Sequence, residues 1–226
     1  MTPPLAPSEA WQPLPASAWN AELARHLLRR AGWAARPDDV TRAVRDGLVA
    51  TLERLFPATP PPLDRPAYLT LAQTRLAELR ALKRKTEDPE ERRLLEREER
   101  ELERAGATEL TFKWLQAAAD PARSAYEKWL LFLADVYVVS AEKVRDADLI
   151  YRHFDLLRTA GTGPAPELTK AISRSPAMIR YLDLDRSSKK APNENFAREL
   201  FELFTLGQGN YTEDDIKQAA RAFTGY

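Results

Sequence analysis

The sequence contains no cysteine among its 226 residues, and this absence excludes several kinds of chemistry. A chain without thiols forms no disulfide framework and offers neither a cysteine nucleophile nor a cysteine ligand for a metal ion. Histidine is nearly absent as well, because only His26 and His153 occur. We interpret both as partly buried, hydrogen-bonded side chains, which is a commoner role for a lone histidine than catalysis.

The sequence also lacks an excess of charge and any long apolar run. Basic and acidic residues number 34 each, so the net charge of +0 gives no electrostatic attraction to nucleic acid or to an anionic membrane. The most apolar stretch, Trp129–Val139, is too short for a membrane span and contains Asp135. Residues 1–17 have neither the basic start nor the apolar centre of a signal peptide. We expect a soluble, cytoplasmic protein with neither nucleic acid nor membrane as a partner.

Signals for β-strands are nearly absent, whereas helix caps and helix breakers recur along the chain. They predict an all-α protein, an irregular bundle of about nine to eleven helices. The proline-rich residues 1–16 are expected to form a disordered or extended tail, and residues 17–226 a single α-helical domain. The sequence contains no glycine-rich phosphate loop after a strand and no Gly-x-Ser-x-Gly elbow.

The composition changes at Pro66 to leucine, alanine and charged residues. A leucine stripe predicts one helix, and Asp88-Pro89 begins a second helix that we expect to end at Gly106. The two helices are interpreted as a protruding, charged hairpin, inserted at residues 64–108. Its mixed charges at helical spacing are typical of a solvated face. A protein partner or a second copy is expected to bind through this 66–106 hairpin or through the C-terminal helix.

The clearest helix lies between Asn193, a suitable N-cap, and Gly207, a suitable left-handed stop. At 100° per residue its apolar side chains share one face, and its charged side chains share the other. The apolar face comprises Phe196, Leu200, Leu203 and Phe204. A last helix through Ile216 and Ala220 is expected to pack back on this one. Phe223 should then be substantially buried, with Leu203 or Phe204 among its contacts.

Four short motifs in order resemble the bacterial family known as domain of unknown function 1800. They are His26–Gly32, Ser175–Met178, Pro192–Gly207 and Arg221–Gly225. The resemblance covers the chain apart from the proline-rich tail and the charged hairpin, and it implies an α-helical protein without indicating an activity.

The chain departs from that family at three histidine positions. The resemblance associates a Trp-His-Asn-His-Phe run with the central helix, but residues 133–137 here read Leu-Ala-Asp-Val-Tyr. A further histidine usual in the family is replaced by Phe204. Members of the family commonly continue beyond the Phe-Thr-Gly motif, so the chain resembles the N-terminal half of that fold or a shortened member.

The helix after Asn193 carries four candidate catalytic residues, Glu194, Arg198, Glu199 and Glu202. A pair of carboxylates on one helix can act as acid and base or can bind a metal ion. The competing interpretation is an ordinary ion-pair ladder in which Arg198 neutralises Glu194 and Glu202 at i, i+4 and i+8. The missing histidines favour the ladder, because carboxylate metal sites in helical bundles normally include Glu-x-x-His pairs.

The loop before this helix has the spacing of a calcium loop at four positions, Asp183, Asp185, Ser187 and Glu194. Ser188, however, stands where such a loop turns on glycine. Arg186, Lys189 and Lys190 suggest instead a seat for an anion near a helix N-terminus. A third interpretation is a solvated connection in which the amides of Asn193 and Asn195 hold backbone groups.

Two classes of function therefore stay open. We favour a non-catalytic structural or protein-interaction module, because the apolar framework is retained while the family's histidines are lost. The alternative is a carboxylate-based, metal-dependent enzyme, or a metal- or anion-binding protein, that uses residues 183–202. Only this alternative requires a cofactor, a divalent metal such as calcium.

Overall fold

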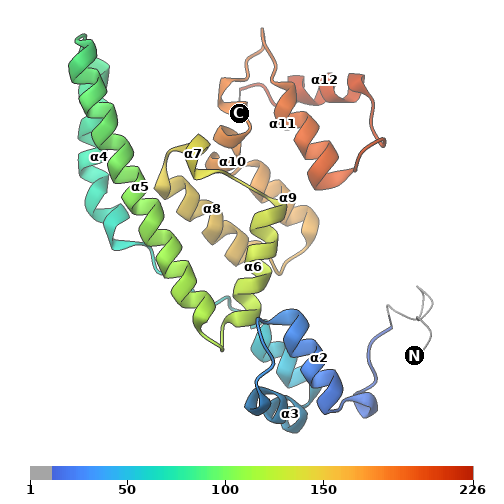
Figure 1. Cartoon of the computed structure of the whole chain (residues 1–226). Coiled ribbons are helices and arrows are strands. Elements are labelled where there is room, and N and C mark those ends of the chain that lie inside the picture. The colour runs from blue at the N-terminus through green and yellow to red at the C-terminus, as the bar shows by residue number, and fades with distance from the viewer. Residues whose placement is uncertain (1–11, 226) are drawn as a thin grey trace.

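A computed structural model describes residues 12–225, and the regular elements in that range are all helical (Figure 1). Apart from one isolated bridge between Ser188 and Ala191, these residues contain no β-structure. The all-α prediction is confirmed, and so is the expected number, since the described residues form eleven α-helices. Within them, no helix is both long enough and apolar enough to cross a membrane. Most of the predicted tail, residues 1–11, lies outside the described residues.

The helices follow the chain in a simple order, with three short 3₁₀ or π segments, named η, between them. The elements are η1 (Ala16–Ala18), α2 (Ala21–Ala31), α3 (Pro37–Leu55), α4 (Ala67–Lys85), α5 (Pro89–Ala119), α6 (Ser124–Val136), α7 (Ala141–Val144), α8 (Ala147–Ala160), α9 (Ala165–Ser173), α10 (Pro176–Tyr181), η2 (Leu184–Arg186), α11 (Glu194–Glu199), η3 (Leu200–Thr205) and α12 (Glu213–Ala222).

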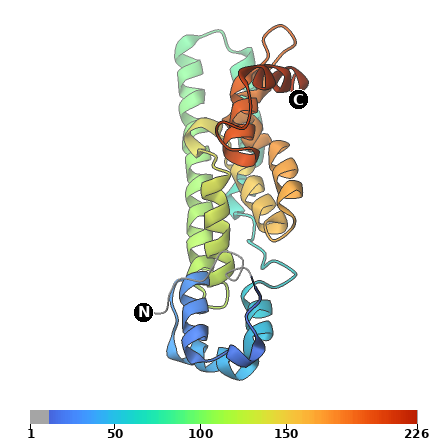
Figure 2. The same cartoon turned by 90° about the vertical axis from the view of Figure 1, so that its right-hand side faces the viewer.

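The helices make an elongated molecule. The pair α2 and α3 forms one end, the hairpin of α4 and α5 runs along one side, and α11 and α12 lie towards the other end (Figures 1 and 2). Helices α6 to α10 fill the middle. The N-terminal pair is attached by polar contacts to the backbone: Trp33 Nε1 donates to the carbonyl of Ala118 at 2.9 Å, and Lys128 Nζ donates to that of Gly32 at 2.9 Å.

The predicted hairpin is present, but its second helix does not end at Gly106. Helix α5 continues to Ala119, and Gly106 lies inside it. A Cβ atom at Gly106 would come within 2.6 Å of Leu69 on α4 and 3.1 Å of Ala147 on α8. Glycine therefore stands here because three helices approach closely, and not because a helix stops. The proposed boundary of the insertion at residue 108 falls within a continuous helix.

The hairpin packs on the bundle at the N-terminus of α8. Glu103 accepts a hydrogen bond at 2.6 Å from the backbone N–H of Ala147, one of the amides that a helix start leaves without an intrahelical partner. Arg80 links Glu103 at 2.8 Å with Asp146 at 3.2 Å, and Asp146 itself caps α8 by accepting from the N–H of Leu149. The pKa of Glu103 is raised overall, because the effect of burial exceeds the lowering effect of the hydrogen bond from Ala147. Hairpin and bundle thus share one network of charges.

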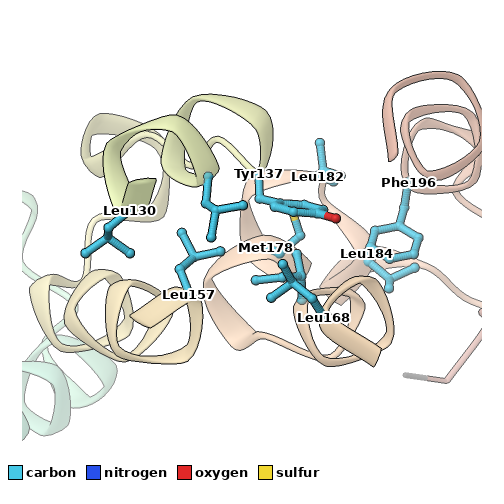
Figure 3. Close-up of a cluster of buried hydrophobic side chains, with 10 residues drawn as sticks. Leu130, Tyr137, Leu157, Leu168, Met178, Leu182, Leu184 and Phe196 are labelled. Atoms are coloured by element: carbon cyan, nitrogen blue, oxygen red, sulfur yellow. The ribbon is translucent and has the colours of Figure 1, made fainter. Parts of the chain in front are cut away.

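The main core contains ten buried side chains from α6, the helices that follow it and the loops between them. It runs from Leu130 and Leu157 at one end to Leu184 and Phe196 at the other (Figure 3). Helix α6 supplies Leu130 and Leu133 and ends at Val136, so the β-prone residues 136–139 form no strand. The most apolar stretch of the sequence thus contributes to the main core.

A buried ion pair joins α6 to α8. Arg158 donates two hydrogen bonds of 2.8 Å to the two carboxylate oxygens of Glu127, and the side chains are 1% and 0% exposed. Arg158 also donates to the carbonyl of Pro61 at 2.9 Å, and Arg123 reaches Glu127 at 2.9 Å. The hydroxyl of Tyr126 donates to the carbonyl of Arg158. A bidentate pair with further hydrogen bonds is the arrangement that makes buried charges tolerable.

We predict that Arg158→Met lowers the free energy of unfolding by about 3–5 kcal/mol, because it leaves a buried carboxylate without its main partner. Chemical unfolding of the purified variant measures this change. The double variant Glu127→Leu/Arg158→Met is the control and should be less destabilised than Arg158→Met, since it leaves no unpaired charge. A loss below about 1 kcal/mol for the single variant would contradict the prediction.

His153 is buried in the same region, and its ring has two partners. Nε2 lies 2.9 Å from the carbonyl oxygen of Tyr137 and Nδ1 lies 3.1 Å from the hydroxyl of Ser175. A neutral ring that donates from Nε2 and accepts at Nδ1 satisfies both. The structural interpretation is confirmed for His153 and is wrong for His26, which is exposed on α2. Burial lowers the pKa of the His153 imidazole.

This lowered pKa predicts a specific pH dependence. The unfolded chain takes up a proton near pH 6.5, whereas folded His153 resists protonation, so its contribution to stability is lost as the pH falls below about 6.5. Between about pH 7 and pH 5 the free energy of unfolding should fall more for the wild type than for His153→Gln. His26→Gln is the matched control, because His26 is exposed on α2, and it should keep the wild-type slope. Equal slopes for all three proteins would show that His153 is not the group involved.

Candidate functional site

The loop between α10 and α11 is held together by asparagine side chains. Asn193 accepts from the N–H of Asn195 at 2.8 Å and so caps α11, as predicted. Its amide also donates to the carbonyls of Asp183 at 2.6 Å and Leu182 at 3.2 Å. Asn195 reaches the same Leu182 carbonyl at 3.4 Å. The interpretation of this loop as a connection tied by its asparagines is confirmed.

The four calcium-loop candidates are not brought together. Asp183 pairs with Lys143 at 2.7 Å, and the hydroxyl of Ser187 accepts from the N–H of Asn193 at 3.1 Å. Asp185 is exposed on η2, and Glu194 lies 4.0 Å from Arg198 on α11. Throughout residues 12–225, no three side chains of the types His, Cys, Asp and Glu are grouped so that they could hold a metal ion.

The basic residues of the loop form no shared seat either. Arg186 faces Asp183 at 3.8 Å, and Lys189 and Lys190 are exposed beside the small Ser188–Ala191 bridge. Helix α11, towards which they were expected to point, is only six residues long.

Arg198 belongs to a different ion pair from the predicted one. It donates two hydrogen bonds of 2.8 Å to Glu213 at the start of α12, and its distance to Glu194 is 4.0 Å. This contact raises the pKa of Arg198 and lowers that of Glu213. Glu202 instead accepts from the hydroxyl of Tyr211 at 2.8 Å and from Gln208 at 3.1 Å. The ladder is therefore formed only between its first two members, and Glu199 takes no part in these contacts.

The helix changes its winding after Glu199. Residues Leu200–Thr205 form a π-helix, and the N–H groups of Leu206 and Gly207 both donate to the carbonyl of Phe201, at 2.8 and 3.0 Å. Gly207 then stops the helix with φ +77°, as predicted. The wider turn rotates the side chains that follow, which is why Leu203 is 59% exposed although α-helical spacing places it on the apolar face.

Beside this π-helix lies an open groove of about 550 Å³ between η3 and α12. Its floor is apolar, and the rings of Phe201 and Tyr211 meet there with their centroids 6.0 Å apart. The lining residues are Phe201, Leu206, Asn210, Tyr211, Asp215, Gln218, Ala219 and Ala222. Sequence reasoning missed this groove because it depends on the π-turn and on a second face of α12, whose alanines give no apolar stripe.

Helix α12 packs on α11 as expected, through Ala197, Ile216 and Ala220. Phe223 is partly buried, and its ring lies edge-on to Phe196 with a centroid distance of 5.0 Å. The ring contact of Phe223 is thus with Phe196, and Leu203, one of its two predicted neighbours, points into solvent.

The three positions that the resemblance associates with histidine all carry apolar side chains. Ala134 and Val136 on α6 and Phe204 on η3 all pack against the ten-residue core cluster. The ring of Phe204 lies 5.3 Å from that of Tyr137, whose hydroxyl is 2.9 Å from that of Thr169. These three positions therefore carry no titratable group, and the hydroxyls of Tyr137 and Thr169 bond to each other.

Residues 26–226 match the model of a family described as Protein of unknown function (DUF1800). Searches for similar proteins gave no match among curated proteins and none among solved structures.

We predict that calcium neither binds to nor stabilises the protein, because Asp183 and Ser187 already have other partners. The melting temperature in excess Ca²⁺ should equal that in a chelator, and elemental analysis should find no stoichiometric metal. Asp185→Asn is the matched variant and should behave as the wild type. A stoichiometric metal that Asp185→Asn removes would contradict the prediction and favour the metal-dependent alternative.

Proposed function

The chain belongs to the DUF1800 family, whose function is unknown, and we propose that it acts as a helical module that binds a protein partner in the groove between η3 and α12. The observation that carries this proposal is the apolar filling of the three histidine positions by Ala134, Val136 and Phe204. Catalysis by side chains needs titratable groups that converge on a reacting atom. The groove offers instead an open, apolar floor with polar groups at its edge.

The chemistry of the groove suggests an amphipathic helix as the occupant. A groove lined by aromatic and small apolar side chains accepts the apolar face of a helix, read as anchors at i, i+3, i+4 and i+7. The first turn of α12 adds Glu213, Asp214 and Asp215, and Asp215 lies in the lining itself. Hydrogen bonds from Thr212 lower the pKa of Asp215, so its carboxylate is ionised at neutral pH. A partner with lysine or arginine beside its apolar anchors would complement this edge.

A displayed library of helical peptides tests the proposal. We expect the selected peptides to carry apolar anchors at helical spacing with basic flanks. Leu206→Glu and Ala222→Glu, both exposed and both in the lining, should weaken their binding at least about tenfold, or 1.4 kcal/mol.

Leu203→Glu is the matched control, because Leu203 is exposed on the same π-helix but does not line the groove. It should leave the affinity of the peptides unchanged. Circular dichroism and melting temperatures establish that each variant is folded. Peptides that bind all three variants equally, or a library that yields no binder, would contradict the proposal.

A further inference from the structure

Helix α4 presents an unusual face at the outer edge of the molecule. It packs on α5 through Leu69, Ala72, Leu76 and Leu79, and α5 separates it from the rest of the bundle (Figure 1). A flank of α4, about 110° around the helix from this packed face, carries Leu71, which is 79% exposed, and Leu82, which is 44% exposed. Between these leucines lie Arg75 and Glu78, whose side chains are 45% and 56% exposed.

The four residues form one straight stripe. Their spacing of four, three and four residues is that of the a and d positions of a heptad, and at 100° per residue they fall within an arc of about 60°. Such a seam normally faces a second helix. A single exposed leucine needs no explanation, but two of them at this spacing with a charge pair between them do.

The order of residues along the stripe identifies the partner. Read in either direction it is leucine, charge, opposite charge, leucine, so the stripe complements itself when a copy runs antiparallel. A two-fold axis between residues 76 and 77 places Leu71 against Leu82 of the second copy and Arg75 against Glu78 of the second copy. A parallel pair would instead place each charge against its own kind, which is unfavourable. We therefore propose that α4 pairs antiparallel with α4 of a second copy of this chain.

The side chains are already arranged for this contact. Glu98 on α5 holds the guanidinium of Arg75 with two hydrogen bonds of 2.7 and 2.9 Å, which fixes its position on the outer face. The contact between Arg75 and Glu78 in the same chain is longer, at 3.3 Å. The contact of Glu78 within its own chain is thus the weaker of the two. In the dimer Glu78 turns to Arg75 of the second copy, and the Arg75–Glu98 pair stays intact.

The size of the surface sets the strength of the dimer. The twelve residues from Leu71 to Leu82 extend about 18 Å, and this seam falls short of the roughly 800 Å² per partner that stable complexes bury. The dimer is isologous and closes on itself, so it leads to no larger assembly. It forms only at high protein concentration and is weakened by salt, because its centre consists of exposed ion pairs.

Analytical ultracentrifugation of the full chain, from about 10 µM to about 1 mM, tests the proposal. The wild type should shift from monomer to dimer within that range. Glu78→Arg alone and Arg75→Glu alone should each stay monomeric, because each places like charges opposite one another. An equimolar mixture of the two variants should form a heterodimer, since every charge then meets its opposite.

Two further variants separate this contact from loss of folding and from unspecific association. Arg75→Glu also faces Glu98, so Leu71→Gln provides an independent test, and it should abolish the dimer without changing the melting temperature. Val49→Gln is the matched control, because Val49 is 70% exposed on α3 and should leave the dimer intact. A wild type that stays monomeric to about 1 mM, a dimer that survives both charge reversals, or a mixture that fails to associate would each overturn the proposal.

Discussion

The rest of the structure depends on the buried pair of Arg158 and Glu127. It fixes the C-terminal part of α8 against α6, and the third bond of Arg158, to the carbonyl of Pro61, attaches the segment between α3 and α4 to the same point. Two charges at 1% and 0% exposure tolerate no other geometry, because any displacement leaves one of them desolvated and unpaired. The pair therefore joins α6, α8 and the segment between α3 and α4 at one point. The other end of α8 is held by Glu103 and Asp146, so α8 is the element to which both sides of the molecule are attached.

The elements that sequence reasoning predicted well are those that local chemistry determines. Asn193 and Asp88 cap their helices, because each side chain reaches only two residues along the chain. The same holds for Gly207, whose positive φ any L side chain would resist. Helix existence and the apolar stripes followed from the same short-range signals.

What could not be predicted depends on residues far apart in the sequence. Gly106 has the local appearance of a helix stop, and only the proximity of Leu69 and Ala147 shows that it is a point of close packing. Arg198 has acidic neighbours on its own helix, but it forms its short hydrogen bonds with Glu213 on the next helix, at 2.8 Å, and lies 4.0 Å from Glu194. Nothing along the chain singles out Glu127 and Arg158 among the many charged residues. The groove lies beside a π-turn in which Leu203 leaves the apolar face that α-helical spacing predicts, whereas Phe204 still packs on the core.

The apolar side chains at the three positions associated with histidine bear on how the C-terminal region works. Ala134, Val136 and Phe204 replace side chains that would have to stay hydrated or hydrogen-bonded, and Tyr137 and Thr169 satisfy each other instead. Phe196 and Phe223 also pack edge-on at this end. The charged side chains of Glu202 and Arg198 bond instead to Tyr211 and Glu213. Among the described residues at this end, the groove beside η3 presents apolar side chains to solvent. On the proposed function, recognition at this end rests on shape and apolar contact, by which one helix binds another, together with the acidic first turn of α12.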